Sequence, residues 1–190
     1  QYTVIGCDVE NFKLYNDVFG VPAGNRLLKD IAEMLLDIKG QDEICGRVNA
    51  DRFLLLRNQE QRTEDYDRFA AAGQKMLSKI SKTVMKWGVY EVTDTTVPVE
   101  KMCDRALLAA DSIKGQYNVH FAVYDDALRS KLLREQIITE SMETALSEHQ
   151  FQVYLQPKFS LMDDRLGGAE ALVRWTHPKM GFLSPGEFIP

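Results

Sequence analysis

The stretch YTVIGCDV (residues 2–9) sets the frame for the rest of the chain. Its residues are largely apolar and β-branched, and the run ends at a carboxylate, Asp8, with Val9 after it. Because such residues favour strands, the stretch predicts a buried strand, and a helix is expected to follow it. A carboxylate at the end of a strand serves more often as a helix cap than as a metal ligand. The stretch alone leaves both roles open for Asp8.

Helices and strands alternate beyond this point. Residues 24–40 place apolar side chains on one helical face and stop at Gly40, and residues 63–81 carry a second apolar stripe at helical spacing. EICGRV (43–48) and RFLLLR (52–57) form the arms of a hairpin, while residues 84–92, 99–115 and 119–124 predict a strand, a helix and a short strand. The order predicts one α/β domain over residues 1–125, with helices packed on a mixed sheet.

The character of the chain changes after Tyr124. Residues 126–149 contain good helix formers without Gly or Pro, which predicts a long connecting helix. Two strands, FQVYLQPKFSL (151–161) and AEALVRW (169–175), and a loop over residues 176–190 follow, so a second domain begins at residue 150. The 41 residues from 150 to 190 are too few to close a core. The apolar positions of the long helix would dock on neighbouring strands or form a dimer seam: Leu128, Leu132, Ile138, Met142 and Ala145.

Composition excludes several classes of function. The chain has 190 residues, of which 45% are hydrophobic, and a formal net charge of −5. An acidic chain is a poor match for nucleic acid, and no apolar run approaches the ~18 residues that a membrane span needs. Three scattered cysteines favour reduced thiols and a cytoplasmic location. Since the chain opens inside a strand, a membrane anchor could stand upstream of it.

The tip of the hairpin has an unusual sequence. In RVNADRF (47–53) the turn is Asn49-Ala50-Asp51-Arg52, without the glycine that a tight turn favours. Asparagine tolerates the left-handed backbone region and alanine much less so. The hairpin is well framed by apolar arms, so its turn requires another explanation.

Two families account for these patterns by resemblance. The last segment resembles the opening of EAL domains, the cyclic di-GMP phosphodiesterase family. DVENFKLYNDVFG (8–20) resembles the opening signature of GGDEF domains, the diguanylate cyclase family, and RVNADRF stands where the Gly-Gly-Asp/Glu-Glu-Phe signature should lie. The resemblance implies a GGDEF-type mixed sheet flanked by helices, a long helix and an incomplete, TIM-barrel-like EAL fragment. The EAL matches are Gln156-Pro157, Gly168, Glu170-Ala171-Leu172, Arg174-Trp175, His177-Pro178, Gly181, Pro185 and Phe188-Ile189-Pro190.

The resemblance implies a magnesium site at the signature. Its ligands would be Asp8, the carbonyl of Val9 and Asp51, whereas the acid of the fourth signature position is replaced by Arg52. A cation there opposes the charge of the metals. The paired glycines are replaced by Asn49 and Ala50, and only the final aromatic, Phe53, is kept.

The implied nucleotide contacts are altered too. Asn16 of the guanine pocket is present, but Asn25 stands where the family has an acid and turns an acceptor into a donor. A lysine near the triphosphate is replaced by Asp111, with Lys114 as a candidate substitute. The product-inhibition site would fall at Gly40 and Glu43 and lacks its arginine.

The EAL motif carries site residues without a complete site. By resemblance Glu170, next to Leu172 in the motif, is a metal ligand, while Gln156 and Arg174 contact the cyclic dinucleotide. The further ligands and the general base of that family lie downstream of residue 190. An intact EAL domain would use Mg²⁺ or Mn²⁺ and bind cyclic di-GMP.

These patterns predict a catalytically inactive GGDEF module that regulates an EAL phosphodiesterase. We expect GTP to bind weakly or not at all, magnesium to bind weakly, and no cofactor to be held tightly. A homodimer stays open. The alternative is a weakly active diguanylate cyclase that uses GTP and magnesium despite its altered signature.

Overall fold

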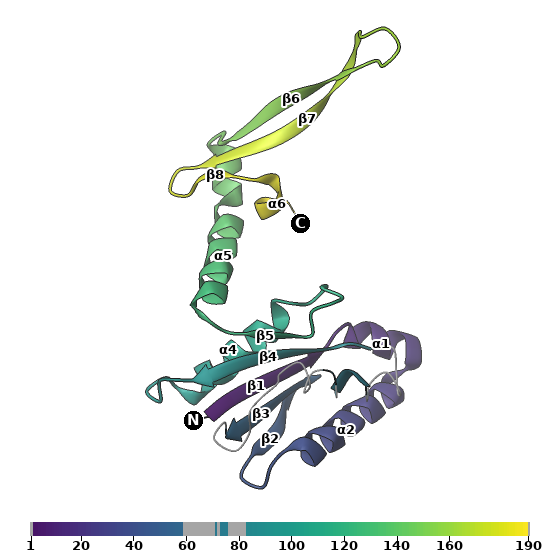
Figure 1. Ribbon diagram of the computed structural model, residues 1–190, viewed down its shortest axis with the longest axis vertical. Coiled ribbons are helices and arrows are strands. Elements are labelled where there is room, and N and C mark those ends of the chain that lie inside the picture. The colour runs from purple at the N-terminus through teal and green to yellow at the C-terminus, as the bar shows by residue number, and fades with distance from the viewer. Residues whose placement is uncertain (1, 59–70, 72, 76–82, 190) are drawn as a thin grey trace. The chain divides into compact units, whose positions relative to one another are not determined.

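The computed structural model describes residues 2–58, 71, 73–75 and 83–189 (Figure 1). They belong to two compact units, residues 1–128 and 129–190. The helix expected over residues 63–81 lies largely outside the described residues. The first unit contains β1 (Tyr2–Val9), α1 (Phe12–Phe19), α2 (Val21–Ile38), β2 (Ile44–Asn49), β3 (Arg52–Asn58), β4 (Met85–Val92), α4 (Val99–Asp111) and β5 (Phe121–Val123), and α5 (Asp126–Ser147) begins at its end.

The first unit is built on a five-stranded sheet in the order β2-β3-β1-β4-β5. All neighbours pair antiparallel except β4 and β5, which are parallel. The expected mixed sheet is therefore confirmed, with the hairpin of β2 and β3 at one edge. β1 lies between β3 and β4 and is buried over Thr3–Val9.

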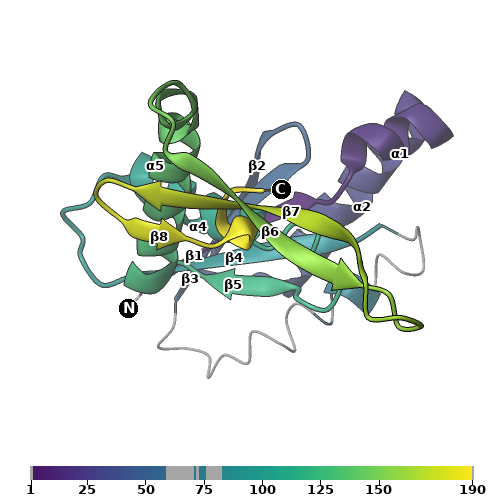
Figure 2. The same ribbon diagram turned by 90° about the horizontal axis from the view of Figure 1, so that it is seen from above.

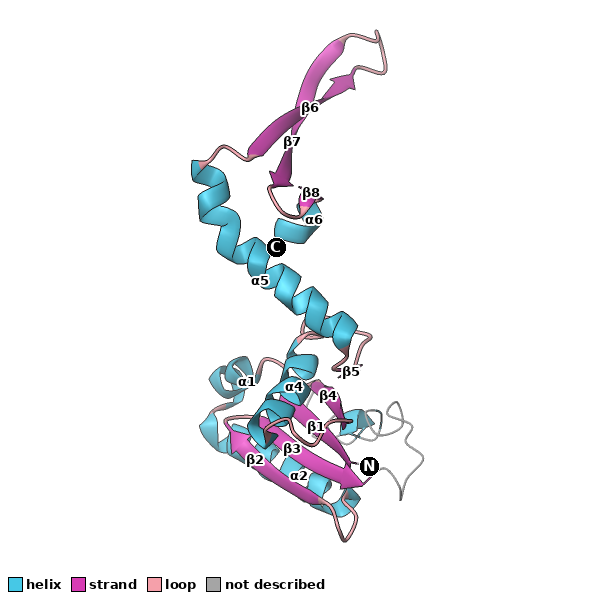
Figure 3. Cartoon of the chain, turned by 90° about the vertical axis from the view of Figure 1, so that its left-hand side faces the viewer, coloured by secondary structure: helices cyan, strands magenta, loops and turns pink. Residues whose placement is uncertain are grey.

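Helices cover both faces of this sheet (Figure 3). Because side chains alternate along a strand, Ile5, Cys7 and Val9 join the core beneath α2, where Leu27 and Ile31 pack. Val4 and Tyr90 point to the opposite face and pack with Met102 and Ala106 of α4. Asp8, two residues beyond Gly6, therefore belongs to the α4 face.

A pair of glycines lets α4 approach the sheet closely. Gly6 and Gly88 are direct partners across β1 and β4. A Cβ on Gly88 would lie 1.8 Å from the carbonyl oxygen of Ala106 and 2.4 Å from the amide nitrogen of Ala110. One on Gly6 would lie 3.1 Å from backbone atoms of α4. We call Gly6 and Gly88 the glycine saddle; α4 rests on it, and its C-terminal end reaches the end of β1.

Two helices stand where one was expected after β1. α1 and α2 are separated by Gly20, whose φ of 83° lies in the region that favours glycine. Helix α2 starts at Val21 and has Pro22 in its first turn. Asn25 therefore lies inside a helix. Asp8 does not act as a helix cap, because the cap residue of α1 is Asn11.

The second unit has a three-stranded sheet, β6 (Phe151–Phe159), β7 (Leu166–His177) and β8 (Gly181–Leu183), with β7 in the middle (Figure 2). A short helix, α6 (Pro185–Phe188), begins with a capping box formed by Ser184 and Glu187. The loop expected over residues 176–190 is thus wrong in part, because β8 and α6 lie within it. The sequence signalled α6 in two ways: it has Pro185 in the first helical turn and the Ser-x-x-Glu spacing of a capping box.

The expected long helix is present as α5, which covers all but the last two of residues 126–149. Ile138 and Ala145 are buried against Trp175, Leu183 and Phe188, so this part of the helix docks on the strands. All three cysteines are free thiols. Among the described residues, no helix combines the length and apolarity needed to span a bilayer.

Candidate functional site

The signature hairpin turns through Ala50 and Asp51. Ala50 has φ of 42°, in the left-handed region, while Asn49 stays in the strand and pairs with Arg52. Arg47 donates from Nε to the Ala50 carbonyl over 2.6 Å. Of the two residues that stand in place of glycines, only Ala50 occupies a conformation that glycine would ease.

Four side chains form a closed ring of alternating charge at the end of β1. Arg52 donates from Nε to Asp8 Oδ2 (3.1 Å) and from Nη2 to Asp111 Oδ2 (2.9 Å). Lys114 Nζ lies 2.8 Å from Asp8 Oδ1 and 2.7 Å from Asp111 Oδ1. We call Asp8, Arg52, Asp111 and Lys114 the ionic ring. It joins the hairpin, β1 and the end of α4.

Burial and charge both act on the ring. The Asp8 side chain is 5% exposed, whereas those of Arg52 and Lys114 are 34% and 37% exposed. Burial opposes the charge of Arg52, but Asp111 and Asp8 outweigh it and raise the pKa of the guanidinium. Burial likewise opposes the charge of Lys114, and its hydrogen bonds to Asp111 and Asp8 raise its pKa overall. Both cations are therefore firmly charged.

Asp51 lies beside the ring without joining it. Its pKa is raised, first by burial and then by the negative charge of Asp8, while Lys114 partly offsets both. Asp8 and Asp51 thus come together, as the resemblance implies. Both face one hollow of about 760 Å³, which Val9, Asn16, Arg52 and Lys114 also line.

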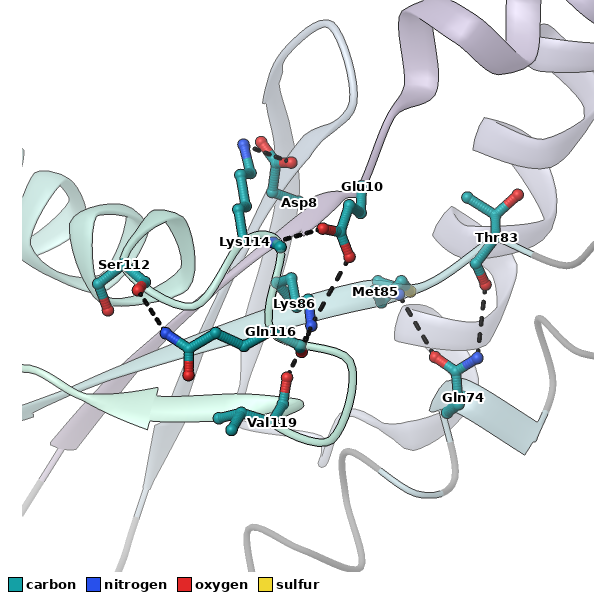
Figure 4. A network of polar contacts seen from close by, with 11 residues as sticks. Asp8, Glu10, Gln74, Thr83, Met85, Lys86, Ser112, Lys114, Gln116 and Val119 are labelled. Carbon is teal, nitrogen blue, oxygen red and sulfur yellow. Dashed lines mark hydrogen bonds and ion pairs between the residues drawn. The ribbon is translucent and has the colours of Figure 1, made fainter. Parts of the chain in front are cut away.

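A second set of contacts continues from the ring (Figure 4). Lys86, the partner of Asp8 on β4, is 0% exposed and donates to the carbonyls of Gln116 (2.6 Å) and Val119 (2.7 Å). Its Nζ also lies 3.6 Å from Glu10 Oε2, and Glu10 Oε1 accepts the Gly115 amide over 2.6 Å. Sequence reasoning missed Glu10 and Lys86. The sequence did carry a signal for Lys86, because a lysine inside an apolar strand needs polar or charged partners when it is buried.

These residues do not fit a divalent metal site. Both oxygens of Asp8 are engaged by cations, and Arg52 occupies the position of a carboxylate. Across residues 2–58, 71, 73–75 and 83–189, no three Asp, Glu, His or Cys side chains gather closely enough to hold a metal ion.

The two asparagines expected to read guanine face different hollows. Asn16 lines the hollow beside the ring, where its buried Oδ1 has no hydrogen-bond partner. Asn25 is exposed and lines a separate hollow of about 410 Å³ between α2 and β2, with Leu28 and Phe53. The Asn16 side chain nevertheless lies against the residue before Asn25, because a Cβ on Gly24 would stand 1.8 Å from Asn16 Oδ1.

The position of the product-inhibition site is used internally. Glu43 is buried; its Oε2 accepts the Gly40 amide (2.6 Å), and its Oε1 lies 3.3 Å from Arg57 Nε. A carboxylate held in this way is turned away from a ligand. The missing arginine and the inward-facing carboxylate of Glu43 both argue against a product-inhibition site at this position.

The EAL residues share one face of the β6–β7 hairpin. Gln156 pairs directly with Glu170, and the next positions on that face bring Leu172 opposite Tyr154 and Arg174 opposite Gln152. Glu170 Oε2 lies 2.9 Å from Lys158 Nζ, and Arg174 stacks over the Tyr154 ring at 5.7 Å. The opposite face is apolar, with Val153 and Leu155 exposed.

A mixed sheet with a signature hairpin beside a strand-end aspartate is the arrangement that the GGDEF resemblance implies, and comparison with known proteins agrees. Residues 1–112 match the family model described as diguanylate cyclase, GGDEF domain, and residues 139–190 match the EAL domain model. The chain belongs to the GGDEF family, and its second part is a portion of an EAL domain. It is thus a member of the GGDEF–EAL group of cyclic di-GMP signalling proteins.

Similar proteins share this order of domains. The cyclic di-GMP phosphodiesterase NbdA of Pseudomonas aeruginosa is 28% identical over 98% of this chain and 24% of its own length. MucR of the same organism, a bifunctional diguanylate cyclase/cyclic di-GMP phosphodiesterase, is 24% identical over 100% of this chain and 29% of its own. This chain therefore spans about a quarter of the length of these relatives.

Solved structures share the fold. The GGDEF–EAL portion of Vibrio cholerae LapD, bound to c-di-GMP, aligns with a TM-score of 0.57 at 16% identity, over 98% of this chain and 45% of that one. The active GGEEF domain of a diguanylate cyclase from Vibrio cholerae aligns with a TM-score of 0.56 at 20% identity, over 66% of this chain and 83% of that one.

Proposed function

We propose that residues 1–125 form a non-catalytic GGDEF domain that regulates a phosphodiesterase domain, of which residues 150–190 are the first part and residues 126–149 the connecting helix. The ionic ring is the observation that carries this proposal. A two-metal cyclase needs free carboxylate oxygens at the end of β1, and here Asp8 is bound on both sides by cations. The altered guanine contacts support the same conclusion.

Ligand binding follows from the same residues. We expect GTP to bind with an affinity no better than high micromolar, because Asn25 offers a donor where the family has an acceptor for the base edge. Magnesium should bind at the signature no better than weakly, because Arg52 and Lys114 hold both oxygens of Asp8. Cyclic di-GMP and tightly held Mg²⁺ or Mn²⁺ belong to an intact EAL domain, since Gln156, Glu170 and Arg174 alone cannot complete a metal-assisted site.

The second candidate, a weakly active cyclase, has one observation in its favour. Asp8, Asp51 and Asn16 still line one hollow large enough for a nucleotide. Product analysis of the pure chain with GTP and either Mg²⁺ or Mn²⁺ decides between the two. The proposal expects no cyclic di-GMP; sustained formation of it would establish the cyclase.

Calorimetry with GTP and ATP tests the binding part. We expect weak binding and poor discrimination between the two nucleotides. Low-micromolar GTP binding with ATP excluded would instead show a working guanine pocket and a GTP-sensing role. The combined variant Asn49→Gly, Ala50→Gly, Arg52→Glu and Asn25→Asp should recover GTP binding before turnover. The matched control is Lys29→Ala. Lys29 lines the same hollow as Asn25 but is not one of the implied nucleotide contacts.

A further inference from the structure

Three elements of the first unit meet at the ionic ring. Arg52 is the first residue of β3, Asp8 stands next to the end of β1, Asp111 is the last residue of α4, and Lys114 follows in the turn after it. Each of the four makes two ion pairs within the ring, all between 2.7 and 3.1 Å. The contacts run between segments far apart in the chain, so the ring fixes tertiary structure.

The ring and a divalent ion compete for the same atoms. An ion that entered would need the lone pairs of Asp8 that Arg52 and Lys114 now hold. It would also lie within a few ångströms of two fixed positive charges, where repulsion is strongest because Asp8 is buried. Binding therefore requires that both cations leave.

We propose that Arg52 and Lys114 are built-in replacements for a divalent ion: they neutralise the end of β1 and fasten the hairpin to α4, so the folded domain neither needs nor admits a metal there. The ring carries two positive and two negative charges and is neutral as a unit. This role concerns the fold and the metal, so it extends beyond the proposed regulatory function and can be tested separately from it.

The neighbouring contacts serve the same end. Gly115, next to Lys114, is held by Glu10, and Lys86 holds the carbonyls of Gln116 and Val119 (Figure 4). The turn that carries Lys114 is thus anchored at several points to β1 and β4. An anchored turn presents the Lys114 ammonium to Asp8 without a ligand to organise it.

The test uses Mn²⁺ as the probe and the full chain as the protein. Binding is measured by the loss of the free Mn²⁺ signal in electron paramagnetic resonance, and stability by the melting temperature in EDTA and in millimolar Mn²⁺. For the unaltered chain we expect no signal loss and the same melting temperature in both solutions. The variant Arg52→Ala/Lys114→Ala frees both oxygens of Asp8, so it should melt lower in EDTA, bind Mn²⁺ and regain stability of about 3 °C or more when the metal is added.

Lys13→Ala is the matched control. Lys13 lines the same hollow but has no ion pair with any described residue, so this variant should behave like the unaltered chain. If the double variant does not fold, Arg52→Gln removes the charge but keeps the first three carbons of the side chain, and it should still melt lower in EDTA. Mn²⁺ binding by the unaltered chain, or an Arg52→Gln variant as stable as it, would overturn the ring as a metal replacement. Neither result touches the regulatory role, which only cyclic di-GMP synthesis contradicts.

Discussion

Gly88→Ala tests whether the glycine saddle positions the ionic ring. The new Cβ would lie 1.8 Å from the Ala106 carbonyl oxygen and 2.4 Å from the Ala110 amide nitrogen. Both are backbone atoms of α4, so no rotation of a side chain relieves the clash, and the helix itself has to move. Overpacking a core costs about 1–3 kcal/mol, and this site belongs at the upper end, near 3 kcal/mol. With a urea m-value of about 2 kcal/mol/M, the midpoint should fall by about 1.5 M.

Tryptophan fluorescence can isolate the first unit. The chain has two tryptophans, and Trp87 belongs to the first unit while Trp175 belongs to the second. In a Trp175→Phe background, urea unfolding followed through Trp87 reports the first unit alone. The control is Gly46→Ala on β2, where a Cβ meets nothing within 4 Å; relief of glycine's extra freedom should stabilise it by about 0.5 kcal/mol. If both variants unfold at the same urea concentration, the saddle argument is wrong.

Three further outcomes are expected. Ala50→Gly should raise the free energy of unfolding by about 0.5 kcal/mol, because the left-handed strain of about 1–2 kcal/mol exceeds the entropy cost of glycine. Asn49→Gly should lower the free energy of unfolding. If chemical denaturation shows shifts of the same sign for both variants, the turn geometry is refuted. The raised pKa of Asp51, due to burial and then Asp8, means that its carboxylate favours folding when protonated and opposes it as the pH rises through that pKa. Asp51→Asn should therefore stabilise the chain at neutral pH and much less in acid below the ordinary pKa of 3.8, and destabilisation at neutral pH would count against this. For Glu187, the hydrogen bond from Arg134, followed by those from Ser184, lowers its pKa to about 2, so its stabilising effect is complete above its ordinary pKa of 4.5 and is lost as the pH falls through about 2. An NMR titration should give that midpoint, and Arg134→Ala should move it upward; an unmoved midpoint would show that the pair does not form in solution.

Much of the fold could be predicted because its elements are marked locally. The strand ending near Asp8, the two arms of the hairpin and the long helix after Tyr124 each carry a periodic apolar pattern, and all three appear in the structure. Gly20 marked the break between α1 and α2, but a glycine followed two residues later by Pro22 also suits a loop. β8 and α6 were missed because three or four residues are too few for a period to show.

The candidate site was less predictable, because its contacts depend on register. The sequence shows that Arg52 stands where the family has an acid and that Asp111 stands where it has a lysine. It does not show that these two residues, 59 positions apart, form a hydrogen-bonded ion pair. That contact forms because Gly6 faces Gly88, which lets α4 lie close to the sheet with its last residue near the end of β1. Strand register and helix height are set by packing across the whole domain, so no local pattern reports them.

The ionic ring also limits how this domain can change over generations. Exchanging Arg52 for an acid in a single step would place a fourth carboxylate among Asp8, Asp51 and Asp111, with Lys114 left as the one cation of the ring. Exchanging Asp111 for lysine first would bring that new lysine against Arg52 and Lys114. Either first step lowers stability before any catalytic benefit can appear. The paired charges therefore resist replacement one at a time, because the exchange of either partner alone leaves like charges facing each other at the end of β1.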